Sequence, residues 1–181
     1  MRPPPLLVGL LFLAGCTGMV RTMAYPFPQP AMAARVILQD AGATGPVLVE
    51  VHGNPFPTDI AAPIAAAASG TIPGLGTRFT ASPAAAARPD TRLVVQFQPG
   101  DHVTAEQICG PLPLAPRPGP GQLVAFTVFC QGPRPVLSAM QWAPLPENAN
   151  SPIIREMAEQ AVLRMFVTNN DSVAPDDYWP D

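Results

Sequence analysis

The chain has 181 residues, which is enough for one domain with a hydrophobic core and too few for two. Its ten basic residues are all arginine, and thirteen acidic residues bring the net charge to −3 at pH 7. No basic patch stands out along the sequence, so nucleic acid is not predicted as a partner.

The first sixteen residues follow the order of an export signal. Arg2 supplies a positive charge, residues 6–13 form a short, mostly apolar run, and Ala14 and Gly15 are small residues before Cys16. The run is far shorter than the roughly 20 apolar residues of a membrane-spanning helix. The segment is therefore interpreted as a secretory signal peptide.

Leu13, Ala14, Gly15 and Cys16 resemble the lipobox of bacterial lipoprotein precursors. In that family the cysteine thiol is diacylated, the signal peptide is cut before the cysteine, and the new amine is acylated, for example with palmitate. The resemblance implies removal of residues 1–15 and a lipid anchor on Cys16 that holds the mature chain on a membrane, on the periplasmic side of the cell envelope. Thr17 stands where the family's inner-membrane retention signal has aspartate, which implies delivery to the outer membrane.

Two terminal segments are predicted to lie outside the folded domain. Residues 16–34 comprise the lipidated cysteine and a tether, since alternating prolines at 26, 28 and 30 favour an extended chain. Residues 169–181 carry four aspartates without apolar periodicity and are predicted to be a disordered acidic tail. The domain itself is predicted to span residues 35–168.

The first half of that domain is predicted to contain a hairpin and a helix. Residues 35–39 and 46–52 are expected to be its two strands, because turn residues separate them and the valines of the second alternate with other side chains. A helix is predicted over residues 60–69, where alanine has the highest helix propensity, with Thr58 or Asp59 as its cap. Residues 71–90 are predicted to be mainly loop.

The second half begins with the clearest strand of the chain, residues 92–98, in which Leu93, Val95 and Phe97 share one face. Thr104 is expected to begin a helical turn, and a proline-rich loop follows over residues 111–120.

The last three predicted elements complete the sheet and cover it. Residues 123–129 are apolar on both faces and predict a central strand, which forms a hairpin with residues 136–142. Ser151 and Pro152 are a typical start for an amphipathic helix. The elements together predict a single α+β domain, an antiparallel sheet of about five strands with this C-terminal helix packed on one face.

Cys109 and Cys130 are the two cysteines left when Cys16 is lipidated, and disulfides persist in exported proteins. A disulfide between them is therefore predicted, with a stabilisation of about 3 kcal/mol in the chain-entropy model. The alternative is a metal site made from both cysteines with His52 and His102, although no CxxC or HxxxH spacing supports it. No cofactor is predicted.

The sequence contains no GxSxG, HExxH, phosphate-loop or EF-hand motif. The candidate site residues are His52 at a strand end and the neighbours Asp101 and His102 at a turn, which could perform acid–base chemistry if the fold brought them together. The function predicted is a non-catalytic binding or structural module of the cell envelope, with another envelope protein as its partner. The alternative is a small periplasmic hydrolase or metal-binding protein that uses His52 and His102.

Overall fold

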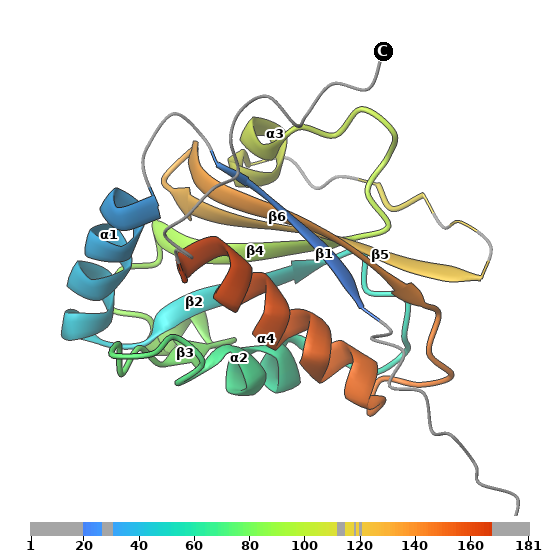
Figure 1. Ribbon diagram of the computed structural model, residues 1–181, viewed down its shortest axis with the longest axis horizontal. Coiled ribbons are helices and arrows are strands. Elements are labelled where there is room, and N and C mark those ends of the chain that lie inside the picture. Colours follow the sequence, from blue (N-terminus) through green and yellow to red (C-terminus); the bar gives the residue numbers. More distant parts are fainter. Residues whose placement is uncertain (1–19, 27–30, 112–114, 118, 120, 168–181) are drawn as a thin grey trace, which may run out of the picture.

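A computed structural model describes residues 20–26, 31–111, 115–117, 119 and 121–167, and the structural statements below concern these residues. Cys16 and the predicted acidic tail lie outside them, as does part of the proline-rich loop. Helices and a six-stranded sheet make up the domain (Figure 1). In chain order the elements are β1 (Arg21–Pro26), α1 (Ala31–Thr44), β2 (Val47–His52), α2 (Ala61–Ala68), β3 (Phe79–Thr80), the 3₁₀ turn η1 (Pro83–Ala85), β4 (Thr91–Phe97), α3 (Ala105–Cys109), β5 (Gln122–Gln131), β6 (Arg134–Pro144) and α4 (Pro152–Phe166).

The sheet has the strand order β1-β6-β5-β4-β2-β3 and is mixed. Strand β2 runs parallel to β3 and β4, whereas the pairs β4–β5, β5–β6 and β6–β1 are antiparallel. The predicted α+β content is confirmed, but the prediction of about five antiparallel strands is wrong in number and in orientation. Parallel neighbours need a long crossover, and the alanine-rich helix α2 lies within the connection from β2 to β4.

Residues 35–39 belong to helix α1 and not to a strand, so the predicted first hairpin is wrong. Ala34, Leu38 and Ala41 are buried at helical spacing, whereas Met32 and Val36 lie one turn apart on the exposed side. The adjacent β-branched residues of this segment have strand propensity, and burial of the helical apolar stripe outweighs it.

The predicted tether contains the edge strand β1, which pairs with β6 from Arg21↔Trp142 to Pro26↔Leu137. The domain therefore includes Val20, which is buried in the main core, and the boundary predicted at residue 35 is wrong. Pro26 ends the strand, at a sheet edge where a missing N–H donor is tolerated.

Helix α4 and strand β6 hold β1 through a short chain of hydrogen bonds. The hydroxyl of Thr22 donates to Gln160 Oε1 at 3.0 Å and accepts from Gln141 Nε2 at 3.1 Å. Gln141, which is buried on β6, also donates to the carbonyl of Met157 at 2.8 Å. These bonds satisfy a buried amide and fix β1 as part of the domain.

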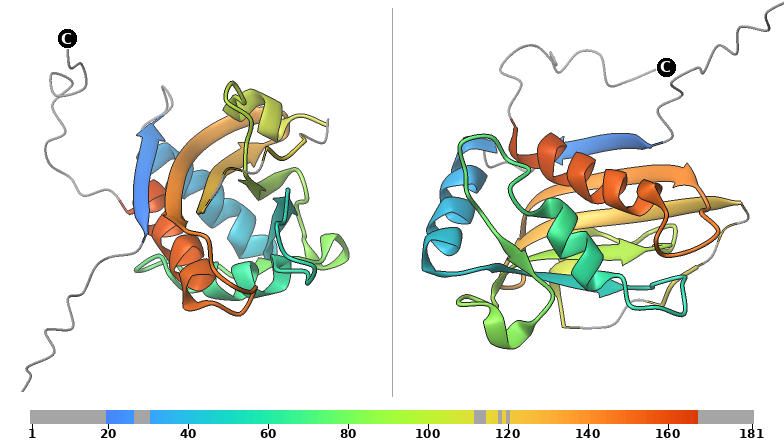
Figure 2. Two further views of the ribbon diagram at one scale, coloured as in Figure 1. Left: turned by 90° about the vertical axis from the view of Figure 1, so that its right-hand side faces the viewer. Right: turned by 90° about the horizontal axis from the view of Figure 1, so that it is seen from below.

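The main core fills the space between the sheet and the helices α2 and α4, which cover one face (Figure 2). Leu93, Val95 and Phe97 face it as the strand pattern predicts, and the rings of Phe129 and Phe166 meet edge to face with centroids 5.0 Å apart. Ser151 caps α4 by accepting from the Ile153 amide, which confirms the predicted helix start.

The short helix α3 lies on the other face of the sheet over a second apolar cluster, which includes Val94, Ile108 and Phe126. Thr104 caps this helix, which confirms the predicted helix start, and it forms a capping box with Gln107. Five residues are too few for a helix to be stable alone. The predicted disulfide is present and joins Cys109, the last residue of α3, to Cys130 on β5.

Gly53 makes a close backbone contact where β2 ends. Its φ is +65°, and a Cβ atom there would lie 2.4 Å from the carbonyl oxygen of Phe97 and 3.1 Å from Pro116 Cβ. Gly70 has a similar φ of +72°, but its position opens to empty space. A comparison of the two positions therefore distinguishes the cost of backbone strain from the cost of steric overlap.

We expect Gly70→Ala to lower the free energy of unfolding by about 1 kcal/mol, because alanine is disfavoured at positive φ. Gly53→Ala carries the same cost and the overlap with β4, so its loss should reach about 3 kcal/mol. Urea unfolding followed by circular dichroism measures both. Equal losses in the two variants would contradict the close packing of Gly53 against β4.

Candidate functional site

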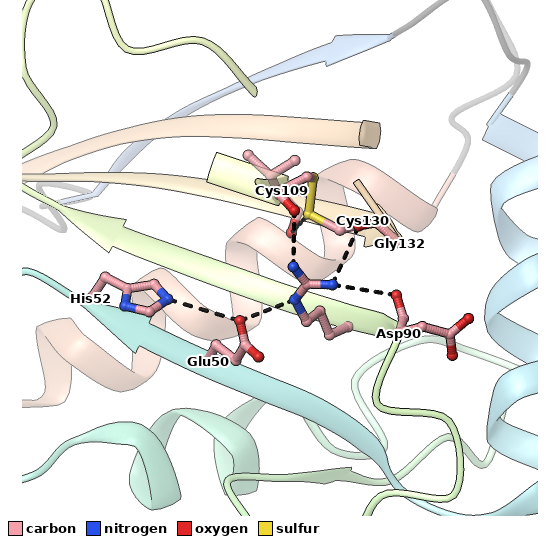
Figure 3. A network of polar contacts seen from close by, with 8 residues as sticks. Glu50, His52, Asp90, Cys109, Cys130 and Gly132 are labelled. Carbon is pink, nitrogen blue, oxygen red and sulfur yellow. Dashed lines mark hydrogen bonds and ion pairs between the residues drawn. A yellow bond between two sulfur atoms is a disulfide. The ribbon is translucent and has the colours of Figure 1, made fainter. Parts of the chain in front are cut away.

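A polar network centred on Arg92 lies on the sheet face that α3 covers (Figure 3). The side chain of Arg92 is only 14% exposed. Its Nε donates to Glu50 Oε2 at 3.0 Å and its Nη2 to the carbonyl of Cys109 at 2.9 Å. Its Nη1 lies 3.3 Å from the carbonyl oxygen of Gly132 and 3.5 Å from that of Asp90.

These contacts join four parts of the chain at one guanidinium group. Glu50 belongs to β2, Cys109 ends α3, and Gly132 lies in the turn between β5 and β6. The Cys109 carbonyl is one of those that a helix leaves unpaired at its C-terminus, and an arginine is a suitable donor for it. Because its donors are directed at protein oxygens, Arg92 acts here as a structural cross-link between secondary-structure elements.

His52 lies beside this network at the end of β2, with an exposed side chain. Its Nε2 is 3.8 Å from Glu50 Oε2, which is longer than a hydrogen bond. The same carboxylate oxygen accepts from Arg92 at 3.0 Å. Glu50 is therefore oriented by arginine, and the geometry does not pair it with His52 as an acid–base couple.

Asp101 and His102 lie in the turn after β4, and both are exposed. Asp101 Oδ2 accepts from Arg117 Nη1 at 2.6 Å, and the Arg117 amide donates to the carbonyl of Gln98 at 2.7 Å. This pair connects the proline-rich loop to the end of β4. Over the described part of the chain, no hydrogen bond or ion pair links Asp101, His102 and His52 to one another.

The disulfide contradicts the metal site that would use Cys109 and Cys130 together with His52 and His102. Both sulfur atoms are bonded to each other, so neither is a thiolate ligand. Within residues 20–26, 31–111, 115–117, 119 and 121–167, no group of three or more His, Cys, Asp or Glu side chains is placed to hold a metal ion.

An open surface groove of about 620 Å³ lies between α2 and the start of α4. Ala66 and Ile154 line its walls, together with Arg155 and Glu159, whose side chains form an ion pair at 2.7 Å. The hydrogen bond and the negative charge of Glu159 raise the pKa of Arg155. Sequence patterns predicted both helices but not their contact, since packing between helices has no local signature.

Sequence reasoning also missed Arg92 and Glu50 as a pair. The available indication was that each is a charged residue in a strand pattern that is otherwise mainly apolar, since buried charges are usually paired. Finding the partner required the parallel register of β2 and β4, in which Leu48 lies opposite Arg92 and Glu50 opposite Val94. The two charged side chains are thus diagonal neighbours on one face.

Comparisons with protein-family models, with curated proteins and with solved structures found no match for this chain. Among the residues that the structure describes, no helix is long and apolar enough to cross a membrane.

We expect Arg92→Met to lower the free energy of unfolding by about 3 kcal/mol, because it leaves Glu50 and the carbonyl groups of Cys109 and Gly132 without this donor. Arg155→Met, which breaks an exposed ion pair, should leave the unfolding midpoint unchanged. Urea denaturation of the two variants measures the contrast.

The double variant Glu50→Gln/Arg92→Met tests the cause of this loss. With the carboxylate neutralised, removal of Arg92 should cost less than it does in the wild-type background, since no unpaired charge remains. An equal cost in both backgrounds would show that Arg92 stabilises the domain through the carbonyl groups alone.

Proposed function

We propose that this chain is an envelope lipoprotein, anchored through Cys16 in the outer membrane, and that it acts as a non-catalytic binding or structural module for another envelope protein. The observation that carries the proposal is the disulfide between Cys109 and Cys130, both of which are buried. Disulfides of this structural kind persist in oxidising compartments and are rare in the cytosol. The lipobox residues Leu13 to Cys16 supply the corresponding export and anchoring signal.

The use of the charged side chains supports a binding role over catalysis. Glu50 is held by Arg92, and Asp101 is held by Arg117. Both pairs connect elements of the fold, so a structural role explains them and no substrate needs to be invoked. The histidines next to them have exposed side chains, the ordinary condition for histidine on a protein surface.

Two exposed surfaces support contact with a partner protein. One is the groove between α2 and α4, in which Ala66 is exposed. The other is the outer side of α1, where Met32 and Val36 are 69% and 61% exposed and lie one helical turn apart. Exposed apolar side chains that adjoin on a helix are typical of surfaces that another protein covers.

The lipid anchor is tested by Cys16→Ser. We expect the wild-type protein to incorporate labelled palmitate and to lose residues 1–15, whereas the variant should remain unlabelled and uncut. The double variant Cys109→Ala/Cys130→Ala is the matched control and should keep the label, because the acylated thiol is that of Cys16. Mass spectrometry of the N-terminal peptide measures both properties. A Cys16→Ser protein that is processed and membrane-bound like the wild type would contradict the anchor.

The partner is tested by photo-crosslinking in intact cells. A photoreactive residue at Ala66 probes the groove, one at Val36 probes α1, and one at the exposed Ala84 in η1 serves as the control. We expect one envelope protein to be captured at Ala66 or Val36 in clear excess over Ala84, and this capture should be lost with Cys16→Ser. The same weak pattern of adducts at all three positions would contradict the binding role.

A further inference from the structure

The start of β1 lies close in sequence to the proposed anchor. Val20 is buried in the main core, so its position relative to the domain is fixed. Cys16 precedes it by four residues, and a fully extended chain covers at most about 3.6 Å per residue, so their Cα atoms are within roughly 14 Å of each other. An acylated Cys16 would therefore hold this end of the domain at the membrane surface.

The corner of the domain at this end is formed by the start of β1, the end of β6 and the start of β5. Arg21 lies directly opposite Trp142 in the sheet, and its Cζ is 5.8 Å from the centroid of the indole ring. Leu145 follows β6 with 45% of its surface exposed, and its amide donates to the carbonyl of Gly121 at 3.2 Å. An open hollow of about 470 Å³ lies here, lined by Arg21, Gly121, Gln122, Trp142, Ala143 and Pro144.

The sheet face that carries Arg21 and Trp142 is the face opposite α4. Their neighbours Thr22 and Gln141 point the other way and hydrogen-bond to α4. Helix α3 covers part of this face, the face opposite α4, over the cluster that includes Phe126. Val124, which pairs with Trp142, lies outside that cluster and is half-buried.

The side chains at this corner match the chemistry of a lipid headgroup layer. Tryptophan is enriched at membrane interfaces, because its ring is apolar and its N–H is polar. The planar guanidinium of an arginine binds phosphate oxygens with two parallel hydrogen bonds. Leu145, which is exposed and follows the end of β6, adds apolar surface at the same end of the sheet.

We propose that the corner formed by Arg21, Trp142 and Leu145 lies against the phospholipid headgroups of the membrane that carries Cys16. This inference rests on the proposed lipid anchor and adds an orientation to it. In that orientation the chain enters β1 at the membrane, and α1 lies at the opposite end of the strand (Figure 1). The anchor thus holds the domain against the lipid surface by one defined corner.

The test uses the mature acylated protein, in vesicles of phosphatidylethanolamine and phosphatidylglycerol that contain a lipid with a nitroxide at its headgroup. Trp179→Phe leaves Trp142 as the single tryptophan of the chain. The matched control is Trp142→Phe/Trp179→Phe/Val36→Trp, which places the single tryptophan on the exposed side of α1. Flotation and the mass of the N-terminal peptide establish first that each protein is acylated and vesicle-bound.

We expect the nitroxide lipid to quench Trp142 about twofold or more relative to the tryptophan at position 36, because only the former lies at the headgroup layer. The further changes Arg21→Gln and Leu145→Ser, made in the Trp179→Phe protein, should reduce the quenching of Trp142. Equal quenching of the two tryptophans in acylated, floating protein would overturn the orientation and leave the anchor intact. Protein that lacks the acyl group and does not float would overturn the anchor and the orientation with it. Unchanged quenching after the changes at Arg21 and Leu145 would overturn their role in the contact.

Discussion

The packing of α3 on the sheet face opposite α4 depends on how Cys109, the last residue of α3, is held. Its carbonyl accepts from Arg92 on β4, and its sulfur is bonded to Cys130 on β5. One contact is electrostatic and the other is covalent, yet both attach the last residue of a five-residue helix to adjacent central strands. Helix α3 is too short to be stable alone. Its place over Phe126 and Val94 therefore follows from these two attachments and from the apolar surface that it buries.

Local sequence patterns predicted the elements whose signals are local. The alternation around Leu93, the two-sided apolar run from 123 to 129 and the cap at Ser151 each correspond to an observed element. Strand β1 and helix α1 were missed for a physical reason. Pairing of β1 with β6 joins residues more than a hundred positions apart, and the prolines near Pro26 favour an extended chain equally well in a tether or at a sheet edge.

The candidate site was predicted less well than the fold, because charged partners are chosen by register. His52 and Asp101 were correctly placed at a strand end and a turn, but Glu50 and Asp101 are paired with Arg92 and Arg117. The Arg92 pair exists only because β2 and β4 are parallel, and the sequence-based prediction contained only antiparallel strands. An error in strand direction thus carried over into the prediction of which side chains could meet.

The place of β1 changes how the proposed anchor would act. A tether of residues 17–34 would let the domain turn freely above the membrane, whereas the ordered strand from Arg21 brings the fixed part of the domain closer in sequence to Cys16. An edge strand normally needs protection against pairing with other chains. On β1 the exposed charge of Arg21 and the proline at its end supply part of it, and the proposed lipid contact at its first residue limits access to the rest. The groove between α2 and α4 lies on the other face of the sheet, which the main core and these two helices occupy.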